Sequence, residues 1–182
     1  EIEFETTAYC NRKCTYCPNV DYERFADNND FLMKEEVFEA LVDQLKEMNF
    51  EGLISPHLYG EPMSDPRMPA WIKYIRKNLP KSRIKIVTNG DFLSKETYKT
   101  YISSGVNIIY ISKHSKKLKK PCRDLLEYLS DEEKKKHILV QDFFSDFNVK
   151  YYYPIYLVIL NIPSLIYEIF PFIFLLSSHI IF

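Results

Sequence analysis

Three cysteines lie close together near the start of the chain. The segment CNRKCTYCPN, residues 10–19, contains Cys10, Cys14 and Cys17, with Tyr16 directly before the third thiol. Thiolates bind zinc ions and iron–sulfur clusters. Because cysteines this close in sequence are poor disulfide partners for one another, the segment is predicted to be a metal-binding loop.

Two kinds of metal group are compatible with three clustered thiolates. Structural zinc takes four protein ligands, so it requires a fourth donor, for which His57 or Cys122 is conceivable. A cubane of four irons and four sulfides that is bound by three thiolates keeps one iron free for a substrate or cofactor. The spacing of three residues and then two favours three corners of one cubane, and zinc remains the alternative.

Five segments with the composition of buried strands follow one another along the chain. They cover residues 2–7, 53–60, 83–90, 106–112 and 137–141. Stretches with helical periodicity or helix-capping signals lie between them. These repeats predict an α/β fold with a parallel sheet and right-handed crossovers, either open or curled into part of a barrel.

The predicted helices carry start and stop signals. Apolar residues at helical spacing predict the buried faces of the first two helices, namely Val37, Leu41, Leu45 and Met48, then Met68, Ile72, Ile75 and Leu79. Asp65 is the predicted N-cap of the second helix, and Ser94 is that of the third. Gly105 stands where the third helix should end, and Ser130 with Glu133 has the spacing of a capping box.

Four polar loops follow the first four predicted strands. They are the cysteine loop, YGEP at 59–62, TNG at 88–90 and SKHS at 112–115. Functional sites of parallel sheets lie at this carboxyl edge, so we expect the loops to form one site. Taken singly, Asn89 is more typical of a tight turn, Ser112 of a strand end, and His57 of a hydrogen-bonded interior position.

The cysteine spacing resembles that of a known family. Cys10, Cys14 and Cys17, with Tyr16 before the third, resemble the CxxxCxΦC signature of the radical S-adenosylmethionine (radical SAM) enzymes. Gly60 and Glu61 resemble the Gly-Glu element that ends the second strand in that family, although Tyr59 stands where many members have another glycine. Asn89 and Ser112 stand where members carry polar residues at the ends of strands three and four.

The resemblance covers roughly residues 1–142 and implies both a fold and a reaction. The implied fold is a partial (β/α)6 TIM-like barrel, incomplete here after about five units. The implied cofactors are a [4Fe-4S] cluster on the three cysteines and S-adenosylmethionine on the open iron. Reductive cleavage would give a 5′-deoxyadenosyl radical that abstracts hydrogen from a peptide or small-metabolite substrate, with flavodoxin or ferredoxin as the reductant.

The resemblance also implies roles for individual residues. Glu61 and the backbone of Gly60 would bind the methionine ammonium group, and Tyr16 would pack beside the cluster or the adenine. Asn89 and Ser112 would approach the methionine carboxylate and the ribose. The alternative is an inactive or truncated iron–sulfur or zinc-binding module, with tethering to a membrane as one variant of it.

Composition excludes some partners and favours a cellular setting. The chain has 24 basic and 25 acidic residues, without the basic excess of nucleic-acid-binding proteins. We therefore expect no nucleic-acid partner. Four cysteines, three of them in one loop, do not indicate a secreted disulfide framework, and no signal peptide is visible, so a cytoplasmic protein is predicted.

The last part of the chain differs in composition from the rest. Residues 151–182 contain one formal charge, Glu168, and three prolines within an apolar run. Three interpretations stay open: a membrane segment, a buried core strand and helix, or a non-native stretch produced by a frameshift. The last is slightly favoured, because this composition is typical of A/T-rich codons. We predict a radical SAM core domain at 1–150 and an apolar tail of uncertain status at 151–182.

Overall fold

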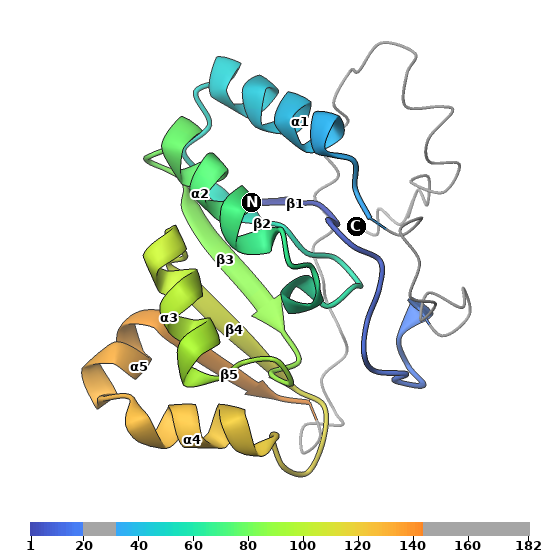
Figure 1. Cartoon of the computed structure of the whole chain (residues 1–182), viewed down its shortest axis with the longest axis vertical. Coiled ribbons are helices and arrows are strands. Elements are labelled where there is room, and N and C mark those ends of the chain that lie inside the picture. Colours follow the sequence, from blue (N-terminus) through green and yellow to red (C-terminus); the bar gives the residue numbers. More distant parts are fainter. Residues whose placement is uncertain (20–31, 144–182) are drawn as a thin grey trace, which may run out of the picture.

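The structure, a computed structural model, describes residues 1–19 and 32–143. Its strands form one parallel sheet in the order β1-β2-β3-β4-β5, which is also their order along the chain (Figure 1). The elements are β1 (Ile2–Glu3), α1 (Glu35–Glu47), β2 (Leu53–Ser55), the 3-10 helix η3 (Pro62–Ser64), α2 (Met68–Asn78), β3 (Arg83–Thr88), α3 (Lys95–Ser104), β4 (Ile108–Lys113), α4 (Lys120–Tyr128), α5 (Asp131–His137) and β5 (Ile138–Asp142). The predicted α/β class with a parallel sheet is confirmed.

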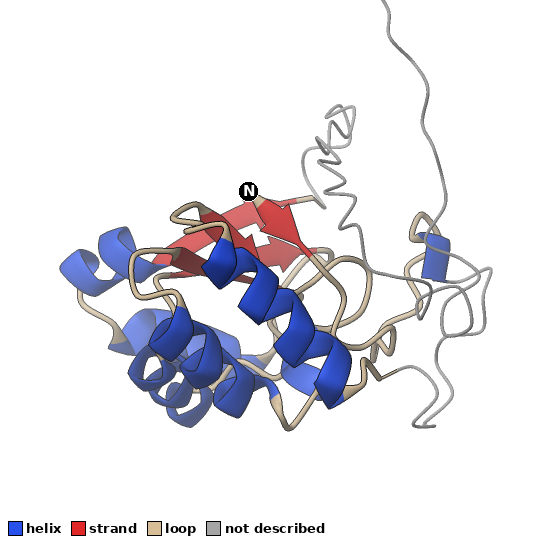
Figure 2. Ribbon diagram, turned by 90° about the horizontal axis from the view of Figure 1, so that it is seen from above, coloured by secondary structure: helices blue, strands red, loops and turns tan. Residues whose placement is uncertain are grey.

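The core lies between the sheet and the helices, which gather on one side of the strands in Figure 2. Isoleucines of neighbouring strands are paired in register and fully buried on this side, for example Ile54 with Ile84 and Ile86 with Ile109. Between them on β3, Lys85 points to the opposite face, where it pairs with Glu1 and Glu3. The alternation follows from the two-residue period of a strand.

The predicted signals of the later helices are confirmed. The side chain of Ser94 accepts a hydrogen bond from the backbone of Thr97 at 3.2 Å, and α3 ends at Gly105, whose φ of 113° is left-handed. Ser130 and Glu133 form both bonds of a capping box at the start of α5. These elements are local, so the sequence pattern was sufficient to place them.

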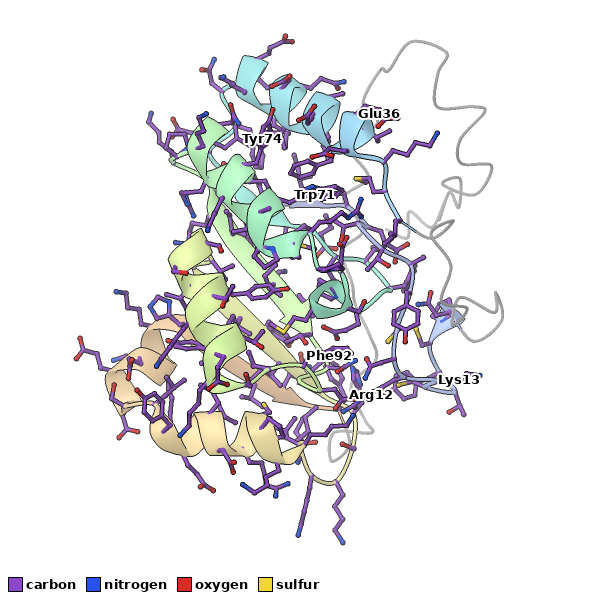
Figure 3. The ribbon with its side chains drawn as sticks, viewed as in Figure 1. Arg12, Lys13, Glu36, Trp71, Tyr74 and Phe92 are labelled. Carbon is purple, nitrogen blue, oxygen red and sulfur yellow. The ribbon has the colours of Figure 1, made fainter. Side chains whose placement is uncertain are left out.

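The predicted buried face of α1 is partly wrong. The buried side chains are Phe38, Leu41, Val42 and Leu45, whereas Met48 at the helix end is 61% exposed and Val37 is half-buried. The face is rotated because the ring of Phe38 stacks on that of Trp71 in α2, with centroids 4.1 Å apart. Trp71 and Tyr74 both extend from α2 toward α1 in Figure 3.

The second helix begins later than predicted. It starts at Met68, and its N-cap position is Arg67, so the prediction that Asp65 is the N-cap is wrong. The carboxylate of Asp65 is instead bound by the guanidinium of Arg67 at 2.8 and 2.9 Å. That guanidinium also donates to the Met33 carbonyl and lies 4.2 Å from the Trp71 ring, which fixes the approach to α2.

The first two strands are shorter than the predicted ranges 2–7 and 53–60. The Phe4 amide still donates to the Ser55 carbonyl of β2 at 3.2 Å, and beyond Phe4 the chain leaves the sheet because its backbone finds other partners. Thr7 forms an antiparallel bridge with Leu32, and the Thr6 carbonyl accepts from Met33. The second strand, β2, likewise ends at Ser55, five residues before the end of the predicted range.

The apolar tail, 151–182, lies outside the described residues, as does any sixth strand. Within residues 1–19 and 32–143, none of the helices combines the length and the apolar character that crossing a bilayer requires.

Candidate functional site

The cysteine loop leaves β1 at the carboxyl edge of the sheet. None of its three cysteines is in a disulfide, and all three are half-buried. A backbone hydrogen bond from the Cys17 amide to the Cys14 carbonyl, 2.9 Å long, closes a turn between two of them. Burial raises the pKa of the Cys10 thiol to about 11. In the free chain this thiol is therefore protonated at neutral pH, and a metal ion would have to displace the proton.

The loop after β2 contacts the start of the cysteine loop at Gly60. A Cβ atom on Gly60 would overlap the Thr7 carbonyl oxygen and lie 3.0 Å from that of Tyr9. No side chain fits there, and the next residue, Glu61, donates its backbone N–H to the Tyr9 carbonyl at 2.8 Å. Glycine is thus required here by the close approach of two backbones.

Two further side chains fasten the same two segments together. An oxygen of Glu5 accepts from the backbone amides of Tyr59 and Gly60, at 2.9 and 2.8 Å. The Nδ2 of Asn19, which is 1% exposed, donates to the carbonyls of Ala8 and Tyr59 at 3.2 and 3.1 Å. Both ends of the cysteine loop are therefore bonded to the segment that follows β2.

Glu61 joins the end of β2 to the end of β3. Its carboxylate, 2% exposed, accepts from the Thr88 hydroxyl at 2.7 Å, the Asn89 amide at 2.8 Å and the Met63 amide at 3.1 Å. Burial raises its pKa to about 7, against the lowering effect of these donors. A carboxylate has about four acceptor positions, and in Glu61 donors of the chain itself occupy three of them.

Asn89 connects Glu61 to the cysteine loop. Its side-chain nitrogen donates to Asn11 at 2.8 Å and lies 3.9 Å from the sulfur of Cys10, within the longer distance that sulfur acceptors allow. Its side-chain oxygen accepts from the Asp91 amide at 2.9 Å. Asn89 is 7% exposed. The predicted turn residue is therefore buried, and its hydrogen bonds connect the cysteine loop, the segment after β2 and the segment after β3.

Asp91 binds the part of the loop between the first two cysteines. Its carboxylate accepts from Nε and Nη2 of Arg12 at 2.8 and 2.5 Å and from Nδ2 of Asn11 at 2.8 Å. Burial tends to raise the pKa of Asp91, yet the hydrogen bonds and charge of Arg12 hold that pKa below its usual value. In Figure 3 Arg12 lies beside Phe92, the neighbour of Asp91, and Lys13 extends away from it.

The end of β4 meets the cysteine loop through aromatic side chains. The hydroxyl of Tyr16 lies 2.6 Å from Nδ1 of His114, and the two ring centroids are 5.7 Å apart. The His114 ring also stacks on Phe143 at 5.2 Å. Ser112 lies two residues earlier in β4 and is 5% exposed. Tyr16 therefore links the third cysteine to the end of β4.

The predicted site residues thus lie on adjoining loops of one edge, with direct contacts between Cys10 and Asn89 and between Glu61 and Asn89. Their expected roles toward a cofactor remain predictions. The sequence analysis missed the side chains that hold the loops together, namely Glu5, Asn11, Arg12, Asn19 and Asp91. Their only sequence signal is their position inside or beside the predicted polar loops.

A structural zinc ion would need a fourth ligand in addition to the three thiols. Cys122, one conceivable fourth zinc ligand, lies on α4 and is fully buried in the hydrophobic core between the helices and the sheet. This burial raises the pKa of its thiol to about 11. Among residues 1–19 and 32–143, no group of three or more His, Cys, Asp and Glu side chains converges as a single ion would need. Three sulfurs that bind three different irons of a cubane need not converge on one point.

Comparison with protein families gives a match over most of the described chain. The family model described as the Radical SAM superfamily matches residues 4–117. This span contains the three cysteines, the Gly60-Glu61 pair and both strand-end residues, Asn89 and Ser112.

Individual relatives agree with the family match. The chain is 32% identical over 114 residues to the S-adenosyl-L-methionine-dependent 2-deoxy-scyllo-inosamine dehydrogenase of Niallia circulans, covering 63% of this chain and 44% of that protein. It resembles the crystal structure of BtrN in complex with AdoMet and 2-DOIA, with 29% identity and a TM-score of 0.66, over 76% of this chain and 54% of that chain. The chain spans about half the length of these relatives.

A more distant structure shares the fold. The tagged form of anSMEcpe with bound AdoMet is 17% identical, with a TM-score of 0.53, over 76% of this chain and 43% of that chain. The parallel sheet with its crossover helices therefore corresponds to part of the TIM-like barrel that the sequence predicted.

Proposed function

Because the chain belongs to the radical SAM superfamily, we propose that it holds a [4Fe-4S] cluster on Cys10, Cys14 and Cys17 and cleaves S-adenosylmethionine reductively. The observation that carries this proposal is the cysteine loop itself, whose three cysteines lie at the carboxyl edge of a parallel sheet and are not joined by disulfides. When bound, the cluster supplies the single electron that splits S-adenosylmethionine into methionine and a 5′-deoxyadenosyl radical.

The residues of the chain would bind and orient the nucleotide. The backbone of Gly60 and the remaining acceptor position of Glu61 would receive the methionine ammonium, in a charge-assisted bond that is stronger than a neutral one. Asn89 and Ser112 would approach the methionine carboxylate and the ribose. Tyr16, held by His114, would pack beside the cluster or the adenine and keep water away from the reacting atoms.

For the substrate, a small alcohol such as an inosamine is favoured over a peptide. The support is the curated relative, whose name describes it as a 2-deoxy-scyllo-inosamine dehydrogenase. The radical would take a hydrogen atom from a carbon of this substrate and become 5′-deoxyadenosine. A one-electron donor such as flavodoxin or ferredoxin would reduce the cluster beforehand.

Anaerobic reconstitution tests the proposal in two steps. After incubation with iron and sulfide, the chain should contain about four irons and four sulfides. Addition of dithionite and S-adenosylmethionine should then yield 5′-deoxyadenosine, measured by liquid chromatography. The Cys14→Ala variant should lose most of the iron and all of the product, because a second iron of the cluster then has no protein ligand.

Cys122→Ala is the matched control, since it removes a thiol that lies in the core. It should keep the iron content and the cleavage of S-adenosylmethionine. A colourless wild-type chain that binds one zinc ion would contradict the proposal. A loaded cluster that forms no 5′-deoxyadenosine would instead identify the chain as an inert cluster-binding module.

A further inference from the structure

Two residues between the first and second cysteines are bonded to one distant carboxylate. Arg12 presents its guanidinium fork to Asp91, with Nε and Nη2 each bonded to a carboxylate oxygen at 2.8 and 2.5 Å. Asn11 adds a third bond at 2.8 Å. A paired fork of this kind fixes the orientation of both partners as well as their separation.

Asp91 is itself held to the sheet, so it can serve as the fixed partner. Its backbone amide donates to Asn89 at 2.9 Å, and it follows Gly90, whose φ of 79° is left-handed. Asn89 in turn donates its backbone amide to Glu61 at 2.8 Å. The carboxylate of Asp91 therefore stands on a turn that is bonded to the ends of both β2 and β3.

This ion pair is more buried than the surface pair of Glu51 and Lys81, so solvent screens it less. The side chains of Asp91 and Arg12 are 3% and 16% exposed, whereas those of Glu51 and Lys81, a pair at the opposite edge of the sheet, are 56% and 74% exposed. Solvent and salt screen exposed pairs strongly and buried pairs much less. Lys119 adds a second cation 3.3 Å from Asp91.

The bonds to Asp91 come from the stretch between Cys10 and Cys14, so they affect how these two thiols are placed. Backbone bonds hold the loop at Tyr9 and within the turn from Cys14 to Cys17. The intervening stretch is held through the side chains of Asn11 and Arg12. The separation of Cys10 from Cys14 thus depends on these side-chain bonds, of which Asp91 accepts three and Asn89 donates one to Asn11.

We propose that Asp91 is a positioning residue that fixes the segment between Cys10 and Cys14 over the end of β3, so that the first two thiols are preorganised for a cluster. This inference rests on the proposed function, because it concerns how the same loop is held. It assigns to Asp91 no contact with cofactor or substrate. Preorganised ligands lose less conformational freedom on binding, which slows the release of iron.

Hydrogen exchange of the metal-free chain tests the positioning directly. In Asp91→Ala and in Arg12→Ala, the backbone amides of residues 10–14 should exchange about tenfold faster, or more, because charge-assisted bonds that close the loop are lost. The double variant should exchange no faster than the faster single variant, since both remove the same interaction. Asp91→Asn, which keeps the shape and one acceptor oxygen, should give an intermediate rate.

Iron release provides the second readout. In the reconstituted chain, a ferrous chelator should remove iron at least about five times faster from Asp91→Ala than from wild type, as expected for loosened ligands. The control is Glu51→Gln, which breaks the exposed pair with Lys81 and should change neither rate. Arg12→Ala keeps the test decisive if Asp91→Ala fails to fold.

Two results would overturn the inference. One is unchanged exchange of residues 10–14 in folded Asp91→Ala and Arg12→Ala. The other is faster exchange with unchanged iron release, because the loop would then move without consequence for the thiols. If no variant, including wild type, holds a cluster, the proposed function fails, and the exchange data alone decide whether Asp91 positions the loop.

Discussion

The two buried carboxylates at the carboxyl edge of the sheet are held in different ways. Glu61, after β2, accepts from one hydroxyl and two backbone amides, all neutral. Asp91, after β3, faces the cations of Arg12 and Lys119. Burial accordingly raises the pKa of Glu61 to about 7, whereas Arg12 keeps the pKa of Asp91 below its usual value although burial opposes this. Glu61 can be protonated in place, but Asp91 depends on its charge.

The two regions also differ in what brings the segments together. Beside Glu61 the backbone of Gly60 is in contact with the backbone of Thr7, so closely that no Cβ atom fits on Gly60. Around Asp91 the contact is between side chains, those of Asn11, Arg12 and Asp91. We therefore expect substitutions near Glu61 to act on the stability of the fold and those near Asp91 to act mainly on the loop.

Gly60→Ala should give the largest effect. The added Cβ would overlap the Thr7 carbonyl oxygen, a backbone atom that cannot rotate away. We expect a loss of about 4 kcal/mol or more in the free energy of unfolding, measured by urea denaturation, because one of the two segments must shift. Iron binding should fall as well, since the cysteine loop begins at this contact.

Gly52→Ala is the matched control for this prediction. Its added Cβ would lie 2.5 Å from the end of the Phe50 side chain, which can rotate to make room. A loss of about 1 kcal/mol is expected. Equal losses at Gly52 and Gly60 would show that the backbone contact at Gly60 is not as close as described.

Glu61→Gln should change how stability depends on pH. The pKa of Glu61 rises from 4.5 to about 7 on folding, so the folded chain binds this proton more tightly. The contribution of Glu61 to stability is therefore full below pH 4.5 and is lost as the pH rises toward 7. The variant should lose this falling slope of stability with pH, as measured by urea denaturation from about pH 5 to 8. At low pH its free energy of unfolding should fall by about 1–2 kcal/mol, because an amide nitrogen replaces one of the two acceptor oxygens.

Asp91 supplies the contrast in the same experiment. Its pKa is lowered from 3.8, so its contribution is present above that pH and is lost only as the pH falls through the lower folded value. Asp91→Asn should therefore leave the slope between about pH 5 and 8 unchanged. If stability still fell with rising pH in Glu61→Gln but no longer did so in Asp91→Asn, the carboxylate with the raised pKa would be Asp91 and not Glu61.

His114→Phe should give the smallest effect. The change removes the 2.6 Å bond to the Tyr16 hydroxyl but keeps a ring that can stack on Phe143. Because Tyr16 is 53% exposed, water can replace the lost partner, and we expect a loss below about 1 kcal/mol. Tyr16→Phe should give a similar loss in thermal or urea unfolding. A loss several times larger in either variant would mean that this contact carries much of the loop's stability.

The sequence predicted the elements whose signals are local. Ser94, Gly105 and the Ser130–Glu133 capping box each act within a few residues, and each was placed correctly. The buried face of α1 was misjudged because it depends on the stacking of Phe38 against Trp71, thirty-three positions away. A periodic pattern shows that a face exists, but its partner helix decides where the face is centred.

The sequence predicted the loops that form the candidate site, but it did not predict the hydrogen bonds and ion pairs that join these loops. The cysteine spacing and the order of strand and loop were sufficient to bring the polar loops to one edge. The bonds of Arg12 and Asn11 to Asp91 join residues about 80 positions apart, and charged residues in loops give no signal of their partners. The early end of β1 likewise followed from the contacts of Thr6 and Thr7, which no local pattern indicates.

The order of the strands has a consequence for the chain as it is synthesised. The thiols of residues 10–17 are synthesised before the residues that fasten their loop, with Gly60 and Glu61 next and Asp91 last. Until then the nascent thiols remain on an unstructured segment, open to oxidation or to capture by stray metal ions. Loading of the proposed cluster would therefore follow translation of the third strand, because a metal donor that acts earlier would meet no finished binding loop.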